Sequence, residues 1–140
     1  MRAGVALAIA IIAGQGVAEP AQEAALNALR AENGLAPLAY SDALNEAAVA
    51  HAQDMAQSGL FSHTGSDGSD VGQRVTRVGY GWCVVAENIA KGQVDLAEVM
   101  QAWADSPGHR ANMLSPEVSE FAIAQGADAL WVMVLAAPGF

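Results

Sequence analysis

Apolar residues recur every three or four positions in four segments of the chain, the spacing that gives a helix one buried face. These segments are residues 21–32, 41–58, 70–78 and 95–105. A further helix is predicted to begin at Pro107, because proline suits the first helical position and Ser106 can accept hydrogen bonds from the first-turn amides. The pattern therefore predicts five helices.

Stretches with a strand pattern lie between and after these helices. Residues 82–89 are rich in β-branched and aromatic side chains. Residues 120–125 and 130–136 alternate or run apolar on either side of a turn at 126–128, which predicts a hairpin. About three antiparallel strands, with helices before, between and beside them, predict an α+β sandwich.

The first 18 residues have the three zones of a secretory signal. Arg2 precedes the apolar run 3–13, and the small residues Gly16 and Ala18 occupy the positions before a cleavage site. A membrane anchor is the weaker interpretation, because the run is shorter than the roughly 20 apolar residues that span a bilayer. We therefore expect residues 19–140 to form a single domain, secreted or periplasmic, with no transmembrane segment.

Acidic residues outnumber basic ones, and this imbalance narrows the choice of partners. Six Lys and Arg against fifteen Asp and Glu give a formal net charge of −9, which becomes −10 once Arg2 is removed. Such a surface would repel nucleic acids and anionic lipid head groups. It is compatible with divalent cations and with neutral ligands.

Cys83 is the single cysteine, so the chain cannot form an intramolecular disulfide. The residues on either side of it are apolar or glycine and bring no cation that would lower the thiol pKa. We therefore expect a buried and inert thiol at this position.

Two of the three histidines fall on predicted helices. His51 lies on the apolar face of residues 41–58, where a core histidine bonded to a backbone carbonyl is favoured over a ligand. His109 lies in the first turn after Pro107, where the positive end of the helix dipole favours the neutral imidazole that can bind a ligand.

Two acidic features have a structural alternative to a functional role. The loop 64–70 lacks the alternating ligands and the terminal glutamate of an EF-hand, so we expect a solvated loop rather than a calcium site. Glu87 lies inside a predicted strand and needs a partner if it is buried. Arg74, Arg77 and Arg110 are the candidate partners.

Several short motifs occur in the order that is found in one protein family. They are Leu-Arg-Ala-Glu-Asn-Gly-Leu at 29–35, Pro37-Leu38, Leu44, His-Ala-Gln-Asp-Met at 51–55, Phe61-Ser62-His63, Glu87-Asn88 and the stretch 103–114. Together they make the chain resemble the CAP superfamily, the cysteine-rich secretory protein, antigen 5 and pathogenesis-related-1 type, in its bacterial form. The resemblance covers about residues 25–135 and implies a three-layer α-β-α sandwich with a small antiparallel sheet.

The resemblance also implies a functional site. In the family, a central cleft carries two histidines and two acidic residues. By motif, His63 and His109 match the histidines and Glu87 matches one of the acids. The other acid would fall three residues after Trp103, where this chain has Ser106. The cleft residues that the resemblance implies are therefore His63, Glu87, Ser106 and His109.

The serine at position 106 weakens the metal site that the resemblance implies. His63 and His109 could bind zinc or another divalent cation, but a usable zinc site generally needs three protein ligands. Glu87 could serve as a ligand or as a carboxylate that orients a histidine, but not as both. Any metal bound here is therefore expected to be weakly held and exchangeable.

Two classes of function remain open at this point. The favoured one is an exported CAP-domain protein that catalyses no reaction and binds a small-molecule, lipid or peptide ligand in its cleft, with a weak divalent metal. The alternative is a metal-assisted hydrolase of the peptidase type, with Glu87 as general base. The sequence has no Gly-x-Ser-x-Gly, His-Glu-x-x-His, phosphate-loop or Cys-x-x-Cys motif, and Ser106 removes one of the two acids that such a mechanism would use.

Overall fold

The computed structural model describes residues 19–139, so the predicted signal at 1–18 lies outside the described residues. The elements are α1 (Glu19–Glu32), β1 (Ala39–Tyr40), α2 (Asp42–Ser58), α3 (Val71–Arg77), β2 (Trp82–Lys91), α4 (Leu96–Ala104), α5 (Pro107–Met113), β3 (Glu120–Gln125), the short 3-10 helix η1 (Ala127–Ala129) and β4 (Leu130–Pro138). All five predicted helices are present. Within the described part of the chain, no helix is both long and apolar enough to cross a membrane.

A four-stranded sheet in the order β1-β3-β4-β2 forms the middle layer. β4 is antiparallel to both of its neighbours, whereas β1 runs parallel to β3. The prediction of about three antiparallel strands is therefore incomplete. β1 has only two residues, too few to show an alternating pattern, and it is recognisable only by its pairing with Glu120 and Phe121.

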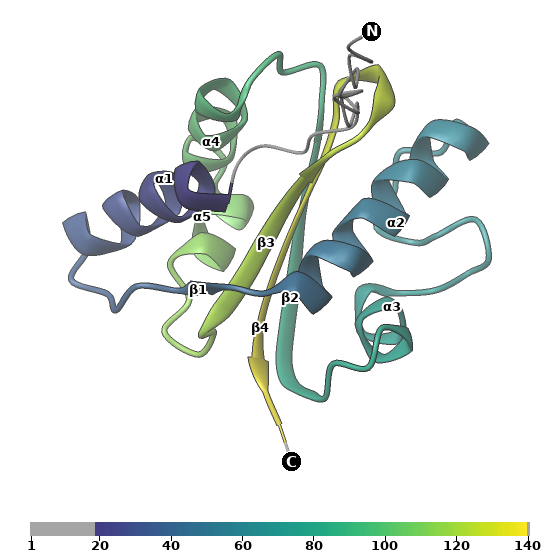
Figure 1. Cartoon of the computed structure of the whole chain (residues 1–140). Coiled ribbons are helices and arrows are strands. Elements are labelled where there is room, and N and C mark those ends of the chain that lie inside the picture. The colour runs from purple at the N-terminus through teal and green to yellow at the C-terminus, as the bar shows by residue number, and fades with distance from the viewer. Residues whose placement is uncertain (1–18, 140) are drawn as a thin grey trace, which may run out of the picture.

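Helices cover both faces of the sheet, as Figure 1 shows, with α2 and α3 on one face and α1, α4 and α5 on the other. Side chains alternate between the two faces along β4. Trp131, Met133 and Leu135 therefore join the core beneath α1 and α4. Val132 and Val134 join the core beneath α2 and α3. The predicted α-β-α sandwich is confirmed.

The loop that follows α2 starts from a sharply defined helix end. Gly59 adopts the left-handed conformation, with φ 74°, and its N–H donates to the carbonyl of Met55. At the far end of the same loop, Asp70 and Gln73 form a reciprocal capping box that starts α3. Both ends of residues 60–69 are thus fixed to helices.

Cys83, near the start of β2, is exposed, so the prediction of a buried thiol is wrong. The residue lies where the register between β2 and β4 shifts, between Trp82 and Val84. Its Sγ lies 3.6 Å from the carbonyl oxygen of Ala137 and 3.5 Å from that of Pro138. Apolar neighbours in sequence did not predict burial here because the strand is irregular at this point.

Candidate functional site

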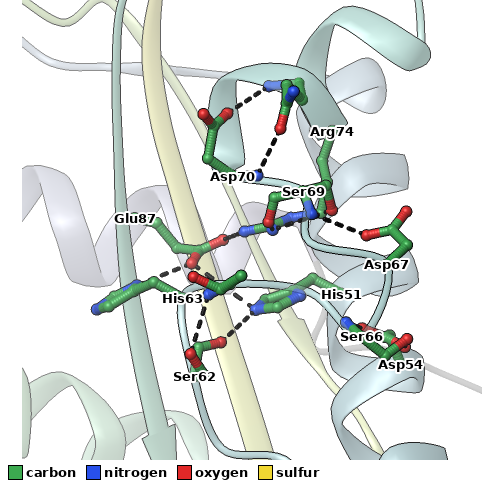
Figure 2. A network of polar contacts seen from close by, with 12 residues as sticks. His51, Asp54, Ser62, His63, Ser66, Asp67, Ser69, Asp70, Arg74 and Glu87 are labelled. Atoms are coloured by element: carbon green, nitrogen blue, oxygen red, sulfur yellow. Dashed lines mark hydrogen bonds and ion pairs between the residues drawn. The ribbon is translucent and has the colours of Figure 1, made fainter.

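Glu87 is a buried carboxylate in β2, and both of its oxygens are engaged (Figure 2). Its side chain is only 2% exposed. Oε1 accepts a hydrogen bond from His63 Nδ1 at 2.9 Å, and Oε2 accepts one from Arg74 Nη2 at 2.8 Å. A buried carboxylate is costly unless it is paired and hydrogen-bonded, so the guanidinium is what allows a glutamate in this position.

Arg74 is buried with Glu87 and is fixed by a second contact. Its Nη1 donates to the carbonyl of Ser69 at 2.7 Å, on the loop just before α3. The prediction that Glu87 needs a partner is confirmed, and Arg74 is the arginine that meets it. Arg77 instead pairs with Asp67 at 2.6 Å on the surface.

His63 lies on the loop after α2, and its side chain is 60% exposed. Since a carboxylate can only accept, Nδ1 of His63 carries the proton of the bond to Glu87. In the neutral ring, Nε2 is then an unprotonated nitrogen available to a ligand. The structure thus places His63 both at the surface and against the buried carboxylate.

His51 lies beside His63, as Figure 2 shows. Its Nε2 lies 2.8 Å from the carbonyl oxygen of Ser62 and 3.8 Å from Glu87 Oε1. Both neighbours are acceptors, so Nε2 carries the proton, while the buried Nδ1 has no partner among the described residues. Burial lowers the pKa of His51, with the charge of Glu87 opposing the shift. The predicted core histidine is confirmed, and it fixes the carbonyl next to His63.

His109 comes from the other face of the sheet, on α5. Its Nδ1 lies 2.8 Å from Ser106 Oγ. The expectation that Ser106 caps the amides of the first turn is therefore wrong, because its hydroxyl contacts the imidazole instead. Burial lowers the pKa of His109, which favours the neutral ring.

Two asparagines hold α5 against β2. Asn88 is fully buried, and its Nδ2 donates to the carbonyl of His109 at 3.1 Å. Asn112 Nδ2 donates to Asn88 Oδ1 at 2.9 Å. These bonds fix the position of His109 relative to the strand that carries Glu87.

The structure brings the four predicted site residues together as two bonded pairs, His63 with Glu87 and Ser106 with His109. Between residues 19 and 139, no group of three or more His, Cys, Asp or Glu is arranged to hold a metal ion. A carboxylate that orients a histidine is nevertheless a common feature of metal sites. The described residues thus offer two histidines, each with Nδ1 engaged by a neighbouring side chain, and not a three-ligand metal site.

Comparison with known proteins places the chain in a known family. The model of the CAP family, the cysteine-rich secretory protein family, matches residues 23–131. The uncharacterized protein YkwD of Bacillus subtilis (strain 168) is 35% identical over 97 residues, which is 69% of this chain and 38% of YkwD. The uncharacterized membrane protein YlbC of the same organism is 28% identical over 97 residues, 69% of this chain and 28% of YlbC. The chain thus spans well under half the length of these relatives.

Solved structures show the same fold. An extracellular protein containing an SCP domain from Bacillus anthracis str. Ames has a TM-score of 0.76 at 27% identity, covering 79% of this chain and 37% of that protein. An outer surface protein of Borrelia burgdorferi has a TM-score of 0.77 at 19% identity, covering 90% of this chain and 99% of that protein. With the family model matching most of its length, the chain belongs to the cysteine-rich secretory protein (CAP) family.

Proposed function

We propose that this protein is an exported CAP domain that binds a ligand through His63 and His109 and catalyses no reaction. The observation that carries the proposal is the burial of Glu87, whose side chain is only 2% exposed and whose two oxygens accept from His63 and Arg74. A general base needs an oxygen that can reach the proton of a water or substrate. Glu87 is therefore better suited to orienting His63 than to acting as the base of a hydrolase.

The free nitrogens define what the site can hold. Hydrogen bonds to Glu87 and Ser106 occupy the Nδ1 atoms of His63 and His109, which leaves Nε2 of each ring for a ligand. Two neutral imidazoles can share a divalent ion or accept hydrogen bonds from a polar group of a bound molecule. With only two protein donors, we expect the ion to exchange readily.

Export is the second part of the proposal. The pattern of residues 1–18 is that of a secretory signal. Two proteins with the same fold are described as an extracellular protein and an outer surface protein. These observations support secretion or a periplasmic location.

A zinc titration by calorimetry tests the site. We expect one-to-one binding that is lost in both His63→Ala and His109→Ala. We expect it to be retained in Asp105→Asn, which removes the charge of a neighbouring exposed acid whose side chain accepts from Gln101. Absence of zinc uptake by folded protein would refute the metal-binding part. Zinc-dependent peptide hydrolysis that His63→Ala abolishes would refute the non-catalytic part.

A further inference from the structure

A second surface lies near the start of β2, the strand that also carries Glu87. A cavity of about 580 Å³ is lined by residues 70–73, Thr76 and Arg77 on one side and by Trp82 and Val85 on the other. None of His63, Glu87, Ser106 and His109 lines it. We call this cavity the α3–β2 groove.

The groove runs along an open strand edge. β2 is the last strand of the sheet and pairs only with β4, as its outer place beside α3 in Figure 1 shows. The carbonyls of Glu87 and Ile89 point away from β4, because they accept from the side chains of Asn112 and Trp103. Backbone groups alternate in direction along an antiparallel strand, so the N–H and C=O of Val85 also point outward. In the described part of the chain, no residue pairs with them.

Trp82 forms a rigid aromatic surface at one end of the groove. Its side chain remains exposed, with 40% of the residue accessible, although Nε1 donates to Thr76 Oγ1 at 3.1 Å and to the carbonyl of Gly72 at 3.2 Å. A Cβ at Gly72 would lie 2.6 Å from the ring, so glycine is what lets the ring lie this close to α3. An aromatic side chain that is already immobilised loses little freedom when a partner packs on it.

The charges around the groove favour a cationic partner. Asp70 caps α3 with one oxygen, while Arg77 is neutralised by its ion pair with Asp67. The local excess charge is therefore negative, as is the charge of the whole chain, −9. Charge complementarity of this kind attracts a basic partner and repels an acidic one.

We propose that the α3–β2 groove binds an extended cationic peptide segment, which adds to the open edge of β2 as an extra strand. Val85 supplies one backbone donor and one acceptor, Trp82 packs against an arginine or apolar side chain, and Asp70 meets the basic residues. This site goes beyond the function proposed for the two histidines and does not depend on whether they bind a ligand.

Fluorescence anisotropy with a labelled hexapeptide that alternates arginine and valine tests the proposal. The matched probe carries N-methyl groups on alternate residues, which keeps its charge but blocks strand pairing. We expect the parent peptide to bind at least tenfold more tightly than this probe and a glutamate–valine peptide not to bind. Equal binding of the first two peptides, or no binding of either, would overturn the proposal.

Variants of the protein test each contact separately. Val85→Pro removes an N–H that points outward and is not bonded to β4. Asp70→Asn removes the charge of this residue but keeps a side chain that caps the helix well. We expect both, and Trp82→Ala, to weaken binding at least fivefold, while Val94→Ala, an exposed apolar residue outside the groove, has no effect.

Zinc binding and peptide binding are independent measurements, so they separate the groove proposal from the proposed function of the two histidines. Zinc binding should be unchanged in folded Trp82→Ala, and peptide binding should be unchanged in His63→Ala. Unaltered peptide binding by folded Trp82→Ala would overturn the groove assignment. So would a dimer in sedimentation that Val85→Pro dissociates, because the open edge would then belong to a second copy of the chain.

Discussion

Replacing Glu87 by glutamine removes the charge at the centre of the site while keeping its size. Arg74, itself 8% exposed, would then be a buried cation with no counter-charge. The new amide also presents N–H₂ to one of two groups that already donate, Nη2 of Arg74 or Nδ1 of His63. Removing one member of a buried ion pair costs about 3–5 kcal/mol, a large part of a typical free energy of unfolding of about 5–15 kcal/mol. We expect Glu87→Gln to lower the free energy of unfolding by about 3 kcal/mol.

His63→Gln is the matched comparison, because it removes the other partner of the same carboxylate. His63 is mostly exposed, and exposed pairs contribute only about 0–1 kcal/mol. Arg74→Met combined with Glu87→Gln removes both buried charges and should recover part of the loss, since neither charge is then left without its partner.

Urea unfolding at neutral pH, followed by fluorescence, measures five proteins: the wild type, the single variants Glu87→Gln, His63→Gln and Arg74→Met, and the double variant. The slope of the free energy of unfolding against urea concentration is fitted separately for each protein. The reasoning is refuted if Glu87→Gln stays within about 1 kcal/mol of the wild type at unchanged slope. It is also refuted if the double variant loses the sum of the two single losses, because Arg74 and Glu87 would then contribute independently.

Three further predictions concern pH, metal affinity and packing. Burial lowers the pKa of His51 and of His109, so below about pH 6.5 the unfolded chain takes up protons that the folded protein does not. Stability should therefore fall on acidification by up to about 1.4 kcal/mol per pH unit for each histidine, until the pKa of that histidine in the folded protein is reached. Thermal unfolding between pH 7.5 and 5 that shows no fall in stability would contradict this prediction. Ser106→Glu restores the second acid and should tighten zinc binding at least about tenfold in calorimetry, and unchanged affinity would count against a two-imidazole site. Gly72→Ala must displace the ring of Trp82, the one exposed tryptophan of the three, so quenching of its fluorescence by acrylamide should rise. Stability should change little, because alanine favours the helix by about 0.5–1 kcal/mol and so offsets the lost ring contact. Unchanged quenching would contradict the contact between Gly72 and Trp82.

Elements with a long periodic pattern were predictable from the sequence, and irregular ones were not. The stripe that ends at Trp103 predicted α4, and the turn at 126–128 predicted the hairpin of β3 and β4. β1 has two residues and forms through pairing with β3. The exposure of Cys83 depends on a shift in register with β4. Both depend on contacts distant in sequence, which a local pattern does not contain.

The site was predictable to a different extent. Motif positions predicted His63, Glu87, Ser106 and His109 as site residues, but not that His63 bonds to Glu87 and Ser106 to His109. Arg74 left a signal in the sequence, because it occupies the position between Val71 and Val78 where the apolar stripe of α3 faces the core, and a charged residue there needs a buried partner. The pairing of Ser106 with His109 left none, because the choice between capping an amide and contacting an imidazole depends on the rotamer of one serine.

The two proposed sites share one strand edge, and side chains divide it. At Glu87 and Ile89, the outward carbonyls of β2 accept from the side chains of Asn112 and Trp103, which compete with an added strand for these acceptors. Toward the start of β2, the backbone of Val85 stays open. Exposed strand edges promote aggregation unless they are short or covered, and here the open part is confined to a short stretch. A peptide can therefore pair with β2 only on the side of Trp82, which leaves the two imidazoles free for a separate ligand.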